Sequence, residues 1–194
     1  MERKKMATKT MVLGALLTAL VVALQFMGAA IKLGPFSVSL VLIPIVIGAV
    51  TCGKTIGAWL GFVFGMAVLL SGDASLFMAV NIPGTIITVL AKGTLCGFIA
   101  GLTYQGLKKL IGKEYLSAVV SALVCPVVNT GIFLIGCKLF FMATITEWAG
   151  GTDVGKYMIF VLVGGNFLFE MAVNIIFAPV IVQLLKIVKK GKRL

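Results

Sequence analysis

The sequence contains no histidine and few charged residues of either sign. Only 12% of its 194 residues are charged, whereas 60% are hydrophobic. A typical soluble domain has about a quarter of its residues charged. This shortage of charge excludes an ordinary soluble domain and indicates that lipid surrounds most of the chain.

The sequence also lacks the pattern of a metal or redox site. Its four cysteines, Cys52, Cys96, Cys125 and Cys137, form no CxxC pair and lie in or beside apolar runs. Zinc and dithiol sites are built from closely spaced cysteine or histidine residues. We therefore expect no metal site and no cofactor, and we expect the cysteines to be packed as small buried residues.

Acidic residues are scarce too, and this bears on one short motif. Residues 48–55 fit the phosphate-binding pattern GxxxxGK[ST], but that loop follows a strand and works with a magnesium-binding acid nearby. The sequence has only six acidic residues, none of them in a motif of that kind. We interpret the segment as a glycine-rich turn and predict that the chain is not an enzyme and does not hydrolyse ATP.

Long apolar runs dominate the rest of the chain. A membrane-spanning helix needs roughly 20 apolar residues, and six such segments separate at polar, glycine or proline residues. The sequence thus predicts an all-α membrane protein: one domain, residues 1–194, forming a bundle of six transmembrane helices. The predicted spans cover about residues 10–31, 38–51, 55–70, 83–104, 116–142 and 157–188. The second is short and contains Pro44, so we expect it to be tilted or irregular.

The distribution of basic residues predicts the orientation. With the N-terminus in the cytoplasm, thirteen lysine and arginine residues fall in cytoplasmic segments and only Lys32 and Lys156 fall outside. Cytoplasmic loops of membrane proteins carry such an excess. We therefore predict cytoplasmic N- and C-termini in a bacterial-type plasma membrane. The net charge of +11 then reflects topology and anionic lipid rather than a nucleic-acid partner.

Polar side chains inside the predicted spans mark a candidate site, because charge within a membrane is costly and usually functional. Lys92 and Glu170 lie near the middle of the fourth and sixth spans, and Asn166 shares a helix face with Glu170. The pair is either a structural ion pair that fixes helix register or the floor of a polar cavity open to the outside. The predicted substrate-binding residues are Asn81, Lys92, Asn129, Lys138, Trp148, Asn166 and Glu170.

Small residues recur at every fourth position on three spans, which allows helix backbones to approach closely. They are Gly57, Gly61 and Gly65 on the third span, Gly93, Gly97 and Gly101 on the fourth, and Ala15, Ala19 and Ala23 on the first. Such stripes serve either packing within the bundle or, on the first span, contact with another subunit.

These features together resemble the S component, the substrate-binding subunit, of energy-coupling factor (ECF) transporters. The resemblance covers essentially the whole chain and includes the alanine stripe and the runs LGPFSVSLVLIPIVIGA, GAWLGFVFG and CPVVNTGIF. It implies capture of a vitamin from outside, mainly by the fourth to sixth spans and the first outer loop. It also implies a membrane coupling protein and two ATPase subunits as partners, with Ala15, Ala19 and Ala23 as the docking surface for the coupling protein.

Two further questions stay open at the level of the sequence. A buried lysine favours an acidic or electron-rich substrate, so pantothenate is the first expectation and riboflavin the second. Alternatively, the chain is a stand-alone secondary carrier or channel for a small polar solute, with Lys92 and Glu170 along its path. A scaffold that transports nothing is a third interpretation.

Overall fold

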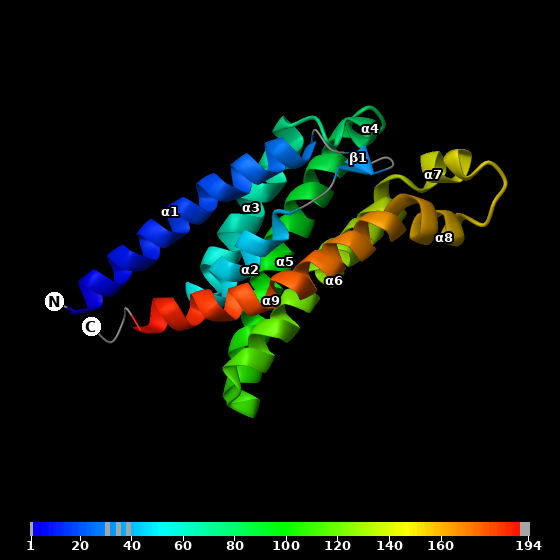
Figure 1. Cartoon of the computed structure of the whole chain (residues 1–194). Helices are drawn as coiled ribbons and strands as arrows, with labels where there is room; N and C mark the ends of the chain where they lie inside the picture. The colour runs from blue at the N-terminus through cyan, green and yellow to red at the C-terminus, as the bar shows by residue number, and fades with distance from the viewer. Residues whose placement is uncertain (1, 30–31, 34–35, 38–39, 191–194) are drawn as a thin grey trace.

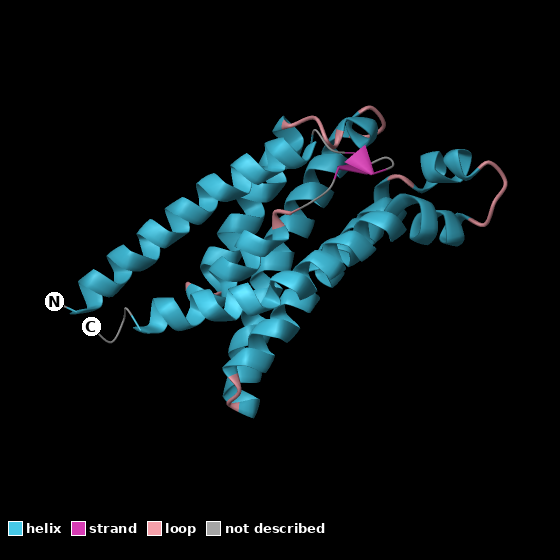
Figure 2. Cartoon of the chain, in the orientation of Figure 1, coloured by secondary structure: helices cyan, strands magenta, loops and turns pink. Residues whose placement is uncertain are grey.

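Helices make up nearly all of the described chain in the computed structural model, which describes residues 2–29, 32–33, 36–37 and 40–190 (Figure 1). In chain order they are α1 (Glu2–Ala29), α2 (Leu42–Thr51), α3 (Lys54–Leu70), α4 (Ser75–Met78), α5 (Ile82–Ile111), α6 (Glu114–Phe140), α7 (Met142–Ala149), α8 (Val154–Lys156), the π-helix η1 (Tyr157–Gly164) and α9 (Gly165–Lys190). A small antiparallel hairpin of β1 (Lys32–Leu33) and β2 (Phe36–Ser37) follows α1 (Figure 2).

Within the described part of the chain, four helical segments are long and apolar enough to cross a membrane. They are Thr8–Ala29, Ile82–Ile111, Glu114–Phe140 and Val154–Ile187. The apolar helices α2 and α3 are shorter: at 1.5 Å per residue they extend about 15 Å and about 25 Å, against a hydrocarbon core of about 30 Å. The predicted helical membrane fold is therefore confirmed, whereas the count of six spans stays a prediction.

Each predicted span overlaps a described helix in the same chain order, but several ends differ. The fifth predicted span runs through Phe141, where the backbone leaves the helical region (φ −129°, ψ 8°) and separates α6 from α7. The fourth extends further than predicted, to Ile111. The predicted end of the first span, the predicted start of the second and part of the first outer loop lie outside the described residues.

Local signals set the limits of α5. The Asn81 side chain accepts a hydrogen bond from the Gly84 amide at 2.9 Å and so caps the first turn. Gly112 ends the helix in the left-handed conformation, with φ 72°, which glycine adopts without a steric penalty. A salt bridge of 2.9 Å between Lys108 and Glu114 then joins α5 to α6 across the turn.

Helix α2 occupies the centre of the bundle. Nine of its ten residues are buried, and it contacts α1, α3, α5, α6 and α9. Burial on all sides explains the sequence of α2, because a helix surrounded by other helices needs apolar residues all round rather than along one stripe.

The two glycine stripes bring α3 and α5 into backbone contact. Gly57 faces Gly97, and Gly61 faces Gly93 so closely that a Cβ on Gly61 would overlap the Gly93 carbonyl oxygen. Close approach of this kind is how small residues hold helices together in lipid. The prediction that these stripes pack helices within the bundle is confirmed.

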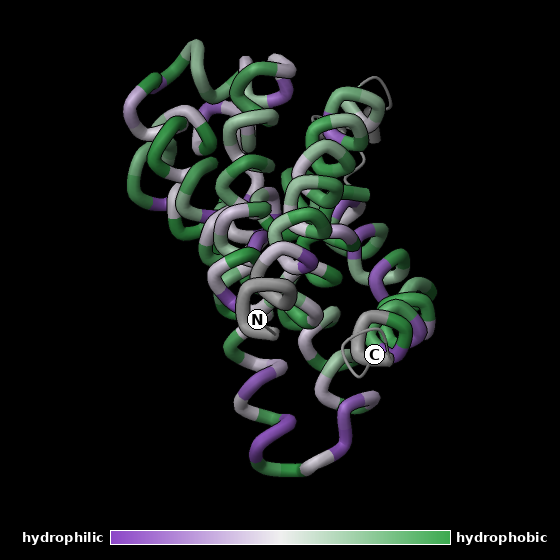
Figure 3. The backbone as a smooth tube through the Cα atoms, turned by 90° about the vertical axis from the view of Figure 1, so that its left-hand side faces the viewer, coloured by the Kyte–Doolittle hydropathy of each residue, from purple (hydrophilic) through white to green (hydrophobic). Residues whose placement is uncertain are grey.

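The bundle has two distinct ends. The start of α1, the end of α9 and the turn between α5 and α6 lie toward one end, while β1, α4, α7 and α8 lie toward the other (Figure 1). Figure 3 shows hydrophobic residues along most of the helices and hydrophilic ones at the α5–α6 turn. The basic helix ends therefore gather on one side of the molecule.

Candidate functional site

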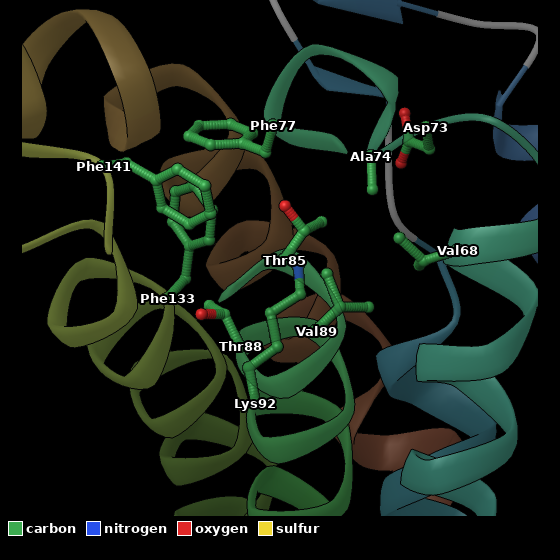
Figure 4. A pocket seen from close by; sticks show the side chains of 10 residues that line it. All are labelled: Val68, Asp73, Ala74, Phe77, Thr85, Thr88, Val89, Lys92, Phe133 and Phe141. Atoms are coloured by element: carbon green, nitrogen blue, oxygen red, sulfur yellow. The ribbon is translucent and has the colours of Figure 1, made fainter. Parts of the chain in front are cut away.

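Two small cavities meet at Lys92 and Phe133. The first lies beside α4 and is lined by polar side chains of Asp73, Thr85 and Thr88 as well as by aromatic rings (Figure 4). The second lies between α5, α6 and η1 and includes Asn129 and Asn166. Each encloses about 30 Å³, which is close to the volume that one molecule occupies in liquid water.

Lys92 projects from α5 into the first cavity. Its side chain extends along the helix toward Thr85, with the ring of Phe133 nearby (Figure 4). The ammonium nitrogen lies 5.3 Å from the centroid of the Phe133 ring and 5.8 Å from that of Phe64. Aromatic faces attract a cation at such distances, so the charge is held by ring contacts on two sides.

Glu170 is the buried acid of the site, with a side chain that is 1% exposed. Its Oε1 accepts a hydrogen bond from Asn166 Nδ2 at 3.3 Å, and its main-chain oxygen accepts one from Asn174 Nδ2 at 2.8 Å. Asn129 lies alongside, and the charge of Lys92 acts on the carboxyl group. Lys92 and Glu170 do not form the direct ion pair that was considered for them. The salt bridge found within 4.0 Å among the described residues joins Lys108 to Glu114.

Several buried oxygens around Glu170 have no hydrogen-bond partner among the described residues. They are Oδ1 of Asn129, Oδ1 of Asn166, Oδ1 of Asn174 and Oε2 of Glu170. A carboxylate only accepts hydrogen bonds, so it turns the NH₂ group of a neighbouring amide toward itself and the amide oxygen away. Each unpaired buried group costs about 1–3 kcal/mol, and a ligand with donor groups would recover that cost.

The structure brings only part of the predicted set together. Lys138 is exposed and lines neither cavity. The Asn81 oxygen is engaged in capping α5, and Trp148 packs edge-on against Phe77 with centroids 5.7 Å apart. The clustered residues are Lys92, Asn129, Asn166 and Glu170, and the binding roles of the other three stay predictions.

Sequence reasoning missed the two threonines of the first cavity. Thr85 and Thr88 lie on the same face of α5 as Lys92, at spacings of seven and four residues. That spacing was a readable signal. Asp73 was missed as well; it accepts a hydrogen bond from the buried Gln25 of α1 at 3.4 Å.

The alanine stripe of α1 lies on the outward face of the bundle. Ala15, Ala19 and Ala23 are exposed, whereas Leu17 and Val21 on the opposite side are buried. The stripe is therefore accessible to lipid or to another protein.

Most of the segments interpreted as structural behave as expected. Cys96, Cys125 and Cys137 are buried free thiols, as predicted, whereas Cys52 is only partly buried. The segment that resembles a phosphate loop comprises the end of α2, the turn at Cys52 and Gly53 (φ 104°) and the start of α3. A helix rather than a strand precedes it, so the interpretation as a turn is confirmed.

Comparison with known proteins identifies the family. The model of the family described as "ECF transporter, substrate-specific component" matches residues 9–183. No curated protein and no solved structure matches the chain significantly. The matched region includes the clustered site residues and the alanine stripe. The chain therefore belongs to the substrate-specific components of ECF transporters.

Proposed function

We propose that the protein binds a vitamin or a related small molecule from the outer side of a bacterial plasma membrane. Family membership already indicates a multi-pass membrane protein that captures a substrate for an ECF importer. Its partners in that importer are a transmembrane coupling component and ATPases. Its task is binding within a transporter rather than catalysis. The proposal concerns the residues that bind and the molecule that is bound.

The observation that carries the proposal is the set of unpaired oxygens around Glu170. Asn129, Asn166 and Glu170 present acceptors in a buried setting, where each unmatched group is costly. Internal packing alone would favour apolar residues at these positions, since nothing in lipid compensates a buried polar group. A substrate with hydroxyl or N–H donors accounts for their presence.

Lys92 supports an anionic or electron-rich group on the substrate. Ring contacts with Phe64 and Phe133 hold its ammonium group in place of a direct ion pair with Glu170. A substrate carboxylate can therefore pair with it without displacing a protein carboxylate. Pantothenate has a carboxylate together with hydroxyl and amide donors, and riboflavin has hydroxyl donors and a flat ring for the aromatic residues. These two remain the leading candidates.

Binding requires the site to open. Cavities of about 30 Å³ are far smaller than the 300–1,000 Å³ typical of small-molecule pockets. Phe133 separates them, and the four-residue helix α4 covers the first through Phe77. We propose that Phe133 and the α4 segment move outward when the substrate enters.

The proposed topology has six membrane crossings with both termini in the cytoplasm. The turns and helix ends rich in lysine lie together at one end of the bundle (Figures 1 and 3), which fits the bias of cytoplasmic segments toward basic residues. Reporter fusions at the α5–α6 turn, near Gly112, and at the Gly150–Gly151 turn test this. The first should report a cytoplasmic and the second an external location.

The outward alanine stripe is the proposed docking surface for the coupling protein. Ala15, Ala19 and Ala23 offer a shallow, exposed surface on which a partner helix can pack at short distance. The stripe lies on the side of α1 away from the polar cluster, so docking and substrate binding use different surfaces.

Calorimetric titration of the purified protein with a panel of vitamins tests the proposed function. Pantothenate or riboflavin should bind, and uptake into liposomes should require the coupling component, the ATPases and ATP. Binding of no vitamin in the panel contradicts the proposal. Uptake by the protein alone, driven by an ion gradient, would instead establish the stand-alone carrier.

A further inference from the structure

An apolar groove runs along the outside of the bundle between α6 and η1. It encloses about 370 Å³, and its lining is almost entirely apolar, including Gly131, Leu134, Phe160, Gly164 and Leu168. Phe160 is 74% exposed and Leu168 67% exposed, so the groove opens on the surface that faces lipid. Its size is that of a ligand pocket.

The groove adjoins the polar cavity of the candidate site. Thr130, Val163 and Phe167 line both spaces. Asn129 and Asn166 lie on the polar side of these three residues, and Gly131 and Gly164 lie on the apolar side. These three side chains thus form the wall that the buried polar cavity shares with the apolar surface groove.

Gly131 leaves the groove open on its α6 side. A Cβ added at Gly131 would meet no atom within 4 Å, so the space beside α6 is free at that point. Gly164, at the end of the π-helix η1, lies on the opposite wall. π-Helical turns occur frequently at functional sites, and this one forms the side of the groove.

The polar cavity defines the head group that fits it. Glu170 accepts from the Asn166 amide nitrogen, so Asn166 presents its oxygen elsewhere, and the oxygen of Asn129 is unpaired as well. The matching head group donates N–H or O–H hydrogen bonds. Lys92 lines the same cavity and adds one cationic donor, which can pair with an electron-rich atom of the head group.

We infer that the substrate is amphipathic. Its donor-rich head group lies against Asn129, Asn166 and Glu170, and its apolar chain or ring passes the shared wall and lies in the groove between α6 and η1. This inference rests on the proposed function, because it extends the same binding site. Because only three side chains separate the cavity from the groove, one molecule that occupies both is favoured over a lipid chain seated independently in the groove.

The test uses N-alkylureas from methyl to octyl as probes, because they combine N–H donors with an apolar chain of adjustable length. Binding to the full-length protein in nanodiscs is measured by titration, with empty nanodiscs subtracted. In the unmodified protein, affinity should rise up to about fourfold per methylene, the value for full burial. Gly131→Leu fills the groove and should abolish this rise, while methylurea should bind as before.

Gly165→Leu is the matched control, because Gly165 is exposed, has open space around it and does not line the groove. It should keep the full dependence on chain length. Leu134→Ala gives a second, independent readout: it enlarges the groove and should improve binding of branched chains relative to linear ones.

The inference is overturned if affinity rises equally with alkyl chain length in Gly131→Leu and in the unmodified protein. It is also overturned if affinity in the unmodified protein does not change with chain length. Native mass spectrometry that finds a membrane lipid retained by the unmodified protein and lost in Gly131→Leu, without any effect on the probes, would assign the groove to lipid instead. Failure of the proposed function is distinguishable, since it appears as loss of vitamin binding and of ATP-dependent uptake.

Discussion

Gly61 of α3 and Gly93 of α5 are in contact through their main chains, and each leaves no room for a Cβ on the other. The neighbouring pair Gly57 and Gly97 repeats this contact one turn away. In lipid, such contacts supply the van der Waals packing that hydrophobic exclusion supplies in water. The two helices therefore form one unit, and Lys92 projects from it beside Gly93.

Replacing Gly93 by leucine should destabilise the protein by about 3 kcal/mol, the upper range for overpacking, because the obstacle is backbone rather than a movable side chain. Thermal unfolding in detergent measures the change. Gly106→Leu on the same helix is the control, since it meets nothing within 4 Å. Equal melting temperatures for both variants would show that the α3–α5 contact does not limit stability.

Replacing Lys92 by methionine should weaken substrate binding about 10- to 100-fold, as expected for the loss of one charge-assisted hydrogen bond. The fold should be retained, because methionine can still pack against Phe64 and Phe133. Calorimetry of the purified variant measures the effect. Lys109→Met, an exposed change at the far end of α5, should bind normally. A Lys92→Met variant with unchanged affinity would remove the anionic anchor from the proposed site.

The same measurement decides the predicted role of Lys138. Its side chain is exposed and lines neither cavity, so the structure favours unchanged affinity in Lys138→Met. A tenfold loss would restore the sequence-based assignment and would indicate that substrate entry passes the end of α6.

Replacing Glu170 by glutamine should lower affinity about tenfold. The glutamine oxygen can still accept from Asn166 Nδ2, so the new NH₂ group takes the place of the unpaired acceptor Oε2. Substrate donors would lose their acceptor. The exposed Glu147→Gln is the control. Unchanged binding in Glu170→Gln would show that the carboxylate does not orient the site.

Replacing Ala19 by leucine should prevent assembly with the coupling component and leave vitamin binding intact. The larger side chain keeps a partner helix from approaching α1. Co-purification with the coupling component and the ATPases measures assembly. Ala172→Leu, an exposed alanine on α9, should assemble normally. If Ala19→Leu forms the complex as well as Ala172→Leu does, the partner docks elsewhere.

The sequence predicted the helices well and their interruptions poorly. Apolar runs and glycine spacing indicated α1, α3, α5 and α6, because both patterns depend on residues close in sequence. The break at Phe141 follows from contacts between distant parts of the chain: Phe141 is 2% exposed and packs with Phe77, Ile145 and Leu162. Nothing in the local hydropathy around Phe141 differs from a helix that continues.

The candidate site was predictable where residue type and helix face coincide. Lys92, Asn129, Asn166 and Glu170, which the structure brings together, could be proposed from the sequence because ionisable and amide groups inside apolar runs are rare. Lys138 stands in the same kind of run, and only the three-dimensional packing shows that its face is outward. Thr85 and Thr88 were missed because a hydroxyl on an apolar helix can bond to its own backbone, as Thr85 does to the Asn81 carbonyl.

Lys92 and Phe133 belong to the walls of both small cavities. A rotation of the Phe133 ring therefore alters the two spaces at once, so filling one cavity should change the shape of the other. Occupancy of one cavity is thermodynamically linked to the shape of the other. The binding free energies of two substrate fragments, one in each cavity, should therefore not be additive even though the fragments do not touch.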